Sequence, residues 1–563
     1  MKKYIFIIIL LITNLLNGLT QDGSVDTSYG ENGTAFLEYQ FQNSETIIDI
    51  EKDQNNRMLF LYEEQKYSDS LYIFENVGTT KIRRFTEDGL IDRSFGTDGM
   101  VEIPVGPFDY YKAFSCQPDN KIVLVGDFPT DSIKAFDRDY CNTKIALLRL
   151  LENGKKDDSF GMQGEVFIDL DTILRGNNLA FQKDGKILVT GSILSDTVTA
   201  KYGDIFQSGD ILLIRLLPNG NNDTLFGKNG FVFTDVEHNS ELLYPLDQDA
   251  GYGIYSLDND NILIAGYSRG PSVPFIGTPF DRILVKYFQN GLIDEEFGEK
   301  GISHSLRNGN SYPQKDGSVF LVYGGGDPWL GDGGIAYLSK FTKEGIIDSS
   351  FAQDGIFETQ RISFWYAAFE ICNTLQDGSI IAWGVFNEAK EEYDSVVSSK
   401  YSFMMMRISP DGTPDPTFGN NGMASWNNGF YNSELHCHLV LKSEQQYIKL
   451  LGSTYMFKDS IQRFFITRII NSERSKSNEK IEFKKITVFP NPACDHFTHE
   501  LPENFNFDNA VMTVYDLYGR VVMQKKGMDN AEAHDISGME NGIYFVELRQ
   551  NDKIFRNKLL ITR

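Results

Sequence analysis

The chain has 563 residues, of which 53 are basic and 78 acidic, so its formal net charge is −25. This charge argues against nucleic acid as a partner, because phosphate binding requires clustered Lys and Arg. Hydrophobic residues make up 41% of the chain, which excludes a disordered or collagen-like protein. Fifty glycines and 13% aromatic residues favour β-structure with many tight turns, and five cysteines are too few for a disulfide framework.

The N-terminus is typical of an export signal. Met1-Lys2-Lys3 precedes a mainly apolar run over residues 4–16, and small residues follow near Gly18 and Thr20. A basic start, a short apolar stretch and a small-residue cleavage region define a secretory signal peptide. A membrane-spanning helix would need about 20 apolar residues. We therefore expect residues 1–20 to be a signal peptide, and the first cysteine, Cys116, lies too far downstream for a lipid anchor there.

A short motif recurs seven times within residues 21–470. It reads Asp-x-x-Phe/Tyr-Gly-x-x-Gly, its copies lie 54 to 71 residues apart, and in one copy Ala352 replaces the first glycine. In six copies a basic residue stands eight positions before the aspartate, within an apolar stretch that is typical of a strand. The aspartates are Asp26, Asp92, Asp157, Asp223, Asp294, Asp348 and Asp415, and the basic residues are Arg84, Arg149, Arg215, Lys286, Lys340, Arg407 and Arg468.

Repetition at this spacing indicates an array of supersecondary units. A polar turn feeding an apolar strand also recurs, and together these landmarks predict four short strands per unit, as in a β-propeller blade. The first motif has no basic strand before it, and the last basic strand, residues 464–470, has no motif after it. We therefore predict an all-β, seven-bladed propeller closed by its N- and C-terminal strands, since closure removes free sheet edges. Closure would bring Arg468 to Asp26.

The recurring turn and motif resemble the delta-60 repeats. That family has a Gln-Pro-Asp-Gly-Lys-Ile-Leu-Val turn followed by an Asp-Gly-Ser-Leu-Asp-x-Ser-Phe-Gly motif. Here one turn reads Gln117-Pro-Asp-Asn-Lys-Ile-Val-Leu-Val and another Gln182-Lys-Asp-Gly-Lys-Ile-Leu-Val. The resemblance covers about residues 22–470 and implies a propeller-like fold. It says almost nothing about activity, because a fold does not fix a function.

The last 80 residues differ from the rest in their pattern of polar and apolar residues. A polar linker over residues 471–482 precedes short alternating runs, which predict the strands of a small β-sandwich over residues 483–563. The order Val-Phe-Pro-Asn-Pro, Val-Tyr-Asp-Leu-Tyr-Gly-Arg-Val-Val, Gly-Ile-Tyr-Phe-Val-Glu-Leu and Lys-Leu-Leu-Ile resembles the type A sorting domain of type IX secretion. The resemblance implies recognition by an outer-membrane translocon and release or attachment at the cell surface. Its motif residues are Pro490, Asn491, Pro492, Gly519, Gly542 and Lys558.

The repeated aspartates could in principle bind calcium or act in catalysis. Because every copy has glycine at the same offset, we interpret them as turn-capping residues that accept backbone N–H bonds. We also expect them to pair with the repeated Arg and Lys residues. No cofactor is predicted, with calcium on these carboxylates as the alternative.

Two groups of metal-capable or redox-capable residues stand outside the repeat. In a strand, His436 and His438 of His436-Cys437-His438 share one face, but zinc needs three or four ligands, so no metal site is predicted. Cys116 and Cys141 could form a disulfide in an exported protein. The alternative is that Cys116 is a buried thiol among apolar neighbours.

A glycine-rich segment over residues 324–334 is the one non-repeated candidate for ligand binding. It lacks the Gly-Lys-Ser/Thr of a phosphate-binding loop. Trp329, flanked by Asp327 and Asp332, could stack on a sugar ring or a peptide. The alternative is a plain connection between strands.

Two classes of function are compatible with the sequence. The first is a secreted or surface module that binds a glycan, a peptide or another surface protein. The alternative is an extracellular glycan hydrolase or lyase with carboxylates in the central funnel. The chain contains no H-E-x-x-H or Cys-x-x-Cys motif. Binding is favoured because the polar chemistry repeats and is not unique to one blade.

Overall fold

The structure is a computed structural model. It describes residues 22–471 and 484–563, apart from residues 32, 43–44, 69–72, 107–109, 131–141, 200–204, 237–247, 270–279, 306–308, 315, 326–333, 361, 363–365, 388–400, 427–432, 444–446, 457–460, 501–509, 517–520, 527–531 and 551–552. The described residues form strands and turns without any helix, so the fold is all-β. Accordingly, none of them forms a helix that could cross a membrane. The expected signal peptide lies outside the described residues.

The chain divides into two compact units, Met1–Glu473 and Arg474–Arg563. In the first unit, runs of four consecutive strands pair as antiparallel meanders. The first three meanders are β2 (Glu45–Lys52), β3 (Met58–Ser68), β4 (Ile73–Phe85) and β5 (Met100–Pro104); β6 (Tyr110–Cys116), β7 (Ile122–Pro129), β8 (Thr143–Leu150) and β9 (Glu165–Ile168); and β10 (Ile173–Phe181), β11 (Ile187–Thr199), β12 (Ile205–Leu216) and β13 (Phe231–Thr234).

The meanders continue in the same pattern along the chain. They are β14 (Gln248–Ser256), β15 (Ile262–Arg269), β16 (Phe280–Tyr287) and β17 (Ile302–Ser305); β18 (Asn310–Pro313), β19 (Val319–Gly325), β20 (Ala336–Phe341) and β21 (Ile356–Glu358); β22 (Ala367–Thr374), β23 (Ile380–Asn387), β24 (Tyr401–Ile408) and β25 (Met423–Trp426); and β26 (Ser433–Ser443), β27 (Tyr447–Met456) and β28 (Ile461–Ile470).

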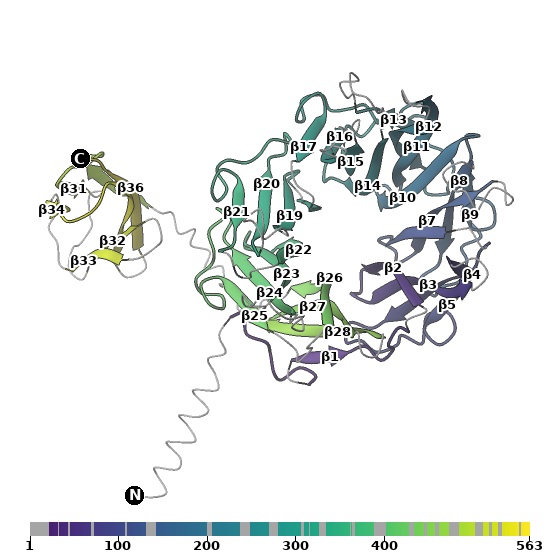
Figure 1. Cartoon of the computed structure of the whole chain (residues 1–563), viewed down its shortest axis with the longest axis horizontal. Helices are drawn as coiled ribbons and strands as arrows, with labels where there is room; N and C mark the ends of the chain where they lie inside the picture. The colour runs from purple at the N-terminus through teal and green to yellow at the C-terminus, as the bar shows by residue number, and fades with distance from the viewer. Residues whose placement is uncertain are drawn as a thin grey trace, which may run out of the picture. The chain divides into compact units, whose positions relative to one another are not determined.

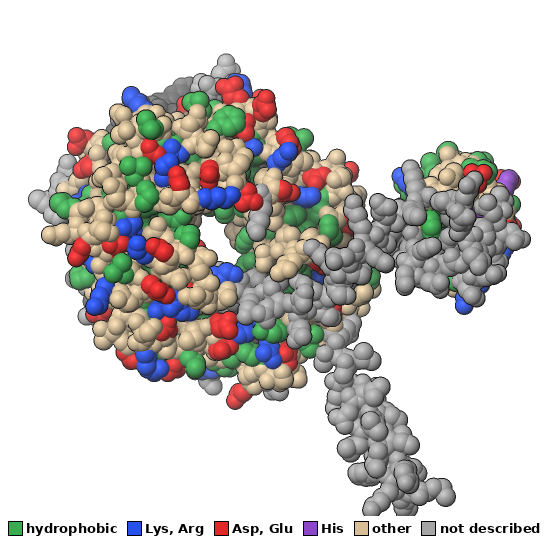
Figure 2. Space-filling model, turned by 180° about the vertical axis from the view of Figure 1, so that it is seen from behind, with side chains coloured by type: hydrophobic (Ala, Val, Ile, Leu, Met, Phe, Trp, Pro, Cys, Tyr) green, Lys and Arg blue, Asp and Glu red, His purple; other side chains and the backbone are tan. Residues whose placement is uncertain are grey.

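The last of these meanders takes its fourth strand from the other end of the chain. β1 (Thr34–Phe36) pairs antiparallel with β28, and Thr34 lies opposite Thr467. Figure 1 shows the meanders side by side around a central opening, with β1 beside β28. Figure 2 shows that an opening remains when the side chains are drawn. The outer strands have only three to five residues, which limits pairing with other chains at these edges.

The core lies between neighbouring meanders. β7 reads Ile-Val-Leu-Val-Gly-Asp-Phe-Pro and is buried along almost its whole length. Leu124 packs in a cluster with Leu59 of β3, whereas Val125 packs in a different cluster with Leu174 of β10. Because both faces of such a strand are covered, its sequence is a continuous apolar run without alternation.

The first strand of a meander lies nearest the opening, as β2, β14 and β22 show in Figure 1. Six of these inner strands carry a β-bulge at the same place, and β18, with four residues, pairs with β19 without one. A bulge bends its strand and redirects a side chain. The bulged residues differ from strand to strand: Ile48, Lys112, Asn177, Tyr252, Glu370 and His438.

The second unit has two sheets that share one core. Val488 and Phe497 of the smaller sheet pack with Val514 and Val546 of the larger one. Period-2 alternation puts these residues on the inner faces. The larger sheet has the order β29 (Lys484–Lys485), β36 (Lys553–Ile561), β35 (Gly542–Gln550), β32 (Val511–Asp516), β33 (Val521–Lys526), and the smaller has β30 (Thr487–Phe489), β31 (His496–Glu500), β34 (His534–Asp535).

The glycines of the repeated motif are required by the backbone. The last glycine of all seven copies has a φ between 81° and 99°. The first glycine is also left-handed, and at Gly298 an added Cβ would lie 2.1 Å from the carbonyl oxygen of Ile302. Ala352 occupies the same position in its copy with a φ of 48°. A side chain in this conformation is strained.

We predict that Ala352→Gly stabilises the protein by about 0.5–1 kcal/mol, because relief of this strain exceeds the added entropy of the unfolded chain. Urea unfolding of the mature chain measures the change. Gly298→Ala is the matched control and should destabilise. A lower unfolding midpoint for Ala352→Gly would show that the position carries no strain.

Candidate functional site

All seven repeated aspartates form an ion pair with a repeated basic residue. The N–O distances are 2.6 to 3.0 Å. Six of the pairs join residues eight apart in sequence. The seventh joins Arg468 to Asp26 from the opposite end of the chain, which is the pair that the sequence predicts for a closed ring.

The aspartate of each pair is also held by its own turn. Asp157 Oδ1 accepts hydrogen bonds from the backbone N–H and the hydroxyl of Ser159, and Oδ2 accepts one from Arg149 Nε at 2.8 Å. Burial alone would raise the pKa of Asp157, but the Ser159 hydrogen bonds and the charge of Arg149 hold that pKa below its ordinary value. The Arg149 guanidinium lies 4.5 Å from the centre of the Phe160 ring. These contacts leave little of the carboxylate for a ligand.

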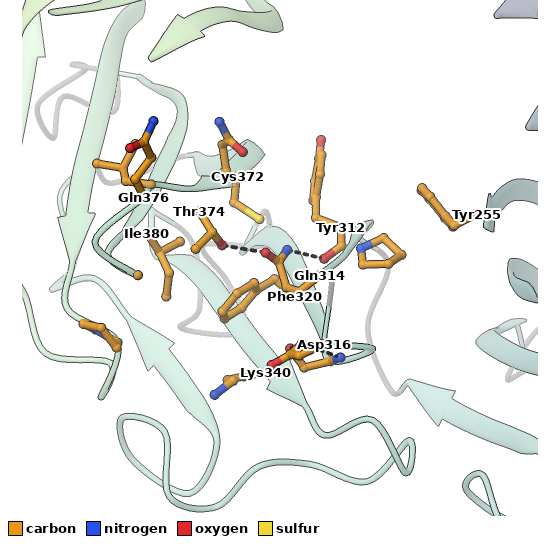
Figure 3. Close-up of a pocket in the computed structure, with 16 residues that line it drawn as sticks. Tyr255, Tyr312, Gln314, Asp316, Phe320, Lys340, Cys372, Thr374, Gln376 and Ile380 are labelled. Carbon is orange, nitrogen blue, oxygen red and sulfur yellow. Dashed lines mark hydrogen bonds between the residues drawn. The ribbon is translucent and has the colours of Figure 1, made fainter. Parts of the chain in front are cut away.

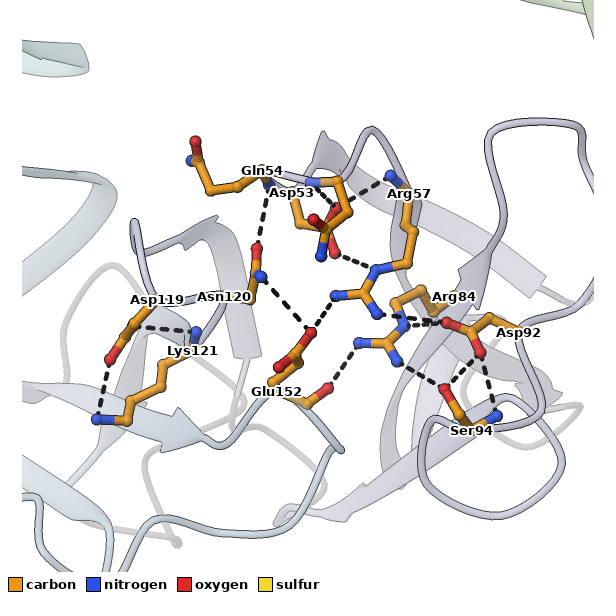
Figure 4. Close-up of polar contacts among 11 residues, drawn as sticks. Asp53, Gln54, Arg57, Arg84, Asp92, Ser94, Asp119, Asn120, Lys121 and Glu152 are labelled. Carbon is orange, nitrogen blue, oxygen red and sulfur yellow. Dashed lines mark hydrogen bonds and ion pairs between the residues drawn. The ribbon is translucent and has the colours of Figure 1, made fainter.

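Several of these basic residues also contact the next meander. Arg84 Nε donates to Asp92, while its Nη1 donates to the carbonyl oxygen of Glu152 at 2.6 Å (Figure 4). Arg149 likewise donates to Pro218 O at 2.5 Å, and Lys286 to Lys343 O at 3.1 Å. One side chain therefore links two meanders.

Arg407, the last basic residue that is followed by a motif, makes its second contact with Asp22 at the beginning of the repeat region. Arg407 Nη2 lies 3.0 Å from Asp22 Oδ2, and Arg407 Nη1 donates to Asn471 Oδ1 at 2.9 Å. The N–H of Gly419 donates to the carbonyl oxygen of Asp22 at 2.6 Å. Our sequence interpretation did not assign a role to Asp22. The signal was present, because Asp22-Gly23 stands eleven residues before Gly33, as Asp88-Gly89 stands before Gly99.

The predicted non-repeated candidates lie partly beyond the structure. Asp327, Trp329 and Asp332 fall outside the described residues, so their role stays a prediction. His436, Cys437 and His438 lie on β26, and their side chains are outside the described set. Cys116 is a buried free thiol, whereas its possible partner Cys141 is not described. The described residues contain no group of three or more His, Cys, Asp or Glu that could hold a metal ion.

A cavity of about 710 Å³ lies beside the short inner strand β18 (Figure 3). Tyr255 and Tyr312 contribute aromatic rings, and Gln314, Asn373 and Thr374 contribute amides and a hydroxyl. Thr374 Oγ1 donates to Gln314 Oε1 at 2.6 Å, and Gln314 Nε2 donates to Tyr312 O at 2.8 Å. These bonds fix the polar groups in place.

The charged groups at this cavity already have partners. Lys340 pairs with Asp348 at 2.9 Å, and Asp316 accepts a hydrogen bond from the Ser318 hydroxyl at 2.6 Å. The cavity is thus aromatic and polar, its lysine is ion-paired, and Asp316 is an anion held by its own turn. The sequence alone does not reveal this cavity, because its aromatic and amide residues lie outside the repeated motif.

Two smaller cavities continue along the inner strands. One of about 270 Å³ is lined by Phe181, Tyr255 and Gln314, and one of about 450 Å³ by Glu51, Cys116 and Tyr255. Burial and the neighbouring Asp49 raise the pKa of Glu51 to about 8. Burial likewise raises the pKa of Asp49 to about 6, although its oxygens accept the N–H groups of Phe114 and Ile50.

Two of the sorting-motif residues, Asn491 and Lys558, are in contact beside β36 in the second unit. Asn491 Nδ2 donates to Lys558 O at 2.6 Å, and Asn491 Oδ1 accepts the N–H of Leu560 at 2.8 Å. The exposed Pro490 and Pro492 flank Asn491, and Gly542 begins β35, the neighbour of β36. Gly519 lies outside the described residues.

Comparison with known families identifies this second unit. Residues 487–562 match the family described as the secretion system C-terminal sorting domain. The C-terminal unit is a secretion sorting domain. It belongs to the type IX pathway and directs the protein to secretion and attachment at the outer cell surface. A comparison with curated proteins finds no match.

Similar solved structures are distant in sequence. An ulvan lyase of polysaccharide lyase family PL25 has 11% identity and a TM-score of 0.41, over 78% of this chain and 98% of that chain. The extracellular region of plexin A4 has 10% identity and a TM-score of 0.36, over 94% and 67%. An α-L-arabinofuranosidase from Fusarium graminearum has 12% identity and a TM-score of 0.31, over 65% and 98%. These similarities are too low to support a functional conclusion.

We predict that Arg215→Ala and Asp223→Ala each destabilise the protein by about 1–4 kcal/mol, because each leaves a buried charge without its partner. The double mutant should lose clearly less than the sum of the two. Urea unfolding of the four proteins measures the coupling. Strict additivity would contradict a direct energetic coupling of the pair.

Proposed function

We propose that residues 21–470 form a closed seven-bladed β-propeller, followed by a linker over residues 471–482 and the sorting domain over residues 483–563. Seven motif copies, the pairing of β1 with β28 and the contact of Arg407 with Asp22 support closure. The resemblance to delta-60 repeats supports the same architecture. The sorting domain engages the type IX translocon, and the propeller is its cargo.

We further propose that the propeller is a binding module for a glycan outside the cell. The observation that carries this proposal is the 710 Å³ cavity with Tyr255 and Tyr312 beside fixed amide and hydroxyl groups. A volume in this range suits a small ligand. Sugar rings present C–H faces that pack on aromatic rings and hydroxyls that bond to amides.

The charge of the protein favours a neutral glycan. The net charge is −25, and Asp316 at the cavity stays an anion held by the Ser318 hydroxyl. A polyanion would meet a repulsive field, because among the described residues that line the cavity the basic one, Lys340, is already paired with Asp348.

The alternative function is that of a glycan hydrolase or lyase. Glu51, with its raised pKa, beside Asp49 on β2 favours it, because paired carboxylates with separated pKa values suit acid–base chemistry. Both oxygens of Asp49 accept backbone N–H groups, however, which leaves it poorly placed as a base or nucleophile. Binding is therefore the function that we favour.

We predict that Tyr312→Ala weakens binding of a glycan found by array screening at least tenfold, because it removes the aromatic platform. Tyr312→Phe should stay within about threefold, since it loses only the hydroxyl that donates to Glu370 O. Titration calorimetry of the mature protein measures both. The matched control is Phe288→Ala, an exposed aromatic in a turn outside the cavity. No glycan binding by the wild-type protein would contradict the proposed function.

A further inference from the structure

The three cavities on the inner strands adjoin one another. Tyr255 lines all three. Phe181 and Ile254 line both the 270 and 450 Å³ cavities, and Gln314 lines both the 270 and 710 Å³ cavities. Figure 3 shows Tyr255 at the side of the largest cavity, across from Cys372 and Thr374. We call this continuous run, from Glu51 past Tyr255 to Gln376, the Tyr255 groove.

We propose that the Tyr255 groove binds an extended neutral oligosaccharide of several units, with Glu51 as a hydrogen-bond donor at its far end. This inference rests on the proposed glycan binding and specifies its substrate class. The largest cavity alone is already the size of a site for one small ligand, so the added 270 and 450 Å³ favour a longer one.

The groove follows the inner strands of several meanders. Most of its lining comes from β2, β6, β10, β14, β18 and β22 and from the turns that follow some of them, and Phe320 of β19, Lys340 of β20 and Ile380 of β23 also line the 710 Å³ cavity. A single sugar would contact only a part of this set. A chain of sugars could contact Tyr312 at one end, Tyr255 in the middle and Glu51 at the other end.

Glu51 is the ionisable group that can bind a ligand at the far end. The neighbouring amide of Asn178 is held in place, because Nδ2 donates to Tyr252 O and Oδ1 accepts the N–H of Leu179. Cys116 is a buried thiol whose pKa is raised by burial. The groups around Glu51 are Asp49 and Lys52 on its own strand, Asp53 in the following turn, Cys116 on β6 and Tyr255 on β14. β26 also packs against β2, and its side chains are outside the described residues.

The protonation state of Glu51 gives the proposal a pH signature. Its pKa of about 8 keeps the carboxyl group neutral at pH 7, so that it has an O–H to donate to a ligand oxygen. Above that pKa the group is a carboxylate, which only accepts. Affinity for a long oligosaccharide should therefore be full below pH 7 and fall as the pH rises through 8.

The test uses the mature protein and cello-, xylo- and manno-oligosaccharides of one to six units. We expect affinity for the bound series to rise at least tenfold from the disaccharide to the hexasaccharide. Glu51→Ala should weaken hexasaccharide binding five- to tenfold and leave disaccharide binding unchanged. Glu51→Gln, which keeps an N–H donor, should stay near wild type and remain constant from pH 6 to pH 9. Glu299→Gln, an exposed turn residue, is the control.

The outcomes separate this inference from the proposed function. If the wild-type protein binds the disaccharide without any gain with length, the groove proposal is wrong and glycan binding stands. Equal loss of di- and hexasaccharide binding in Glu51→Ala, or a wild-type affinity that does not change with pH, would also overturn it. If Glu51→Ala does not fold, the comparison of wild type with Glu51→Gln across pH decides. No binding of any series would contradict both proposals.

Discussion

In five of the seven repeats the basic side chain serves two neighbours at once. Arg149 satisfies the carboxylate of its own turn and, through another nitrogen, a carbonyl oxygen of the next meander. Guanidinium offers five donors in a rigid fork, and Lys286 achieves the same with the three donors of an ammonium. Backbone hydrogen bonds of 2.6 to 3.1 Å accompany these side-chain links. In them, the N–H of the residue after the motif aromatic donates to a carbonyl oxygen in the neighbouring turn. The stability of one meander therefore depends on the next, and Asp22 extends the dependence to the chain's own beginning.

Because these links lie in the turns, they do not constrain the side chains of the inner strands, which differ from one meander to the next. The bulged residues range from Ile48 to Lys112 and Glu370, although the backbone repeats. The cavity residues Tyr312 and Gln314 lie on and just after β18, the short inner strand without a bulge. The same separation of roles explains why the repeated aspartates are poor ligand-binding candidates: their oxygens are used by the turn and by the basic residue.

The spacing of residues in the sequence could predict the repeated ion pairs. The offset of eight residues predicts the local ion pairs, and the unmatched Arg468 predicts its contact with Asp26. The cavities could not be predicted in this way, since Glu51, Tyr255 and Tyr312 are 57 or more residues apart and become neighbours only through the arrangement of the inner strands. The alternating stretch around Glu51 is typical of a strand with a solvated face, and it gives no sign that this face meets a cavity. Trp329, chosen from local composition, lies in a segment outside the described residues.

The central claim is that the seven repeats are one cooperative unit because their links continue across the two ends of the chain. Amide hydrogen exchange after deletion of residues 22–36, which removes Asp22, Asp26 and β1, tests it most directly. We expect faster exchange throughout the repeats, including β14 on a remote meander, with a single unfolding transition at lower urea. Faster exchange confined to β26, β27 and β28, with β14 unchanged, would contradict it.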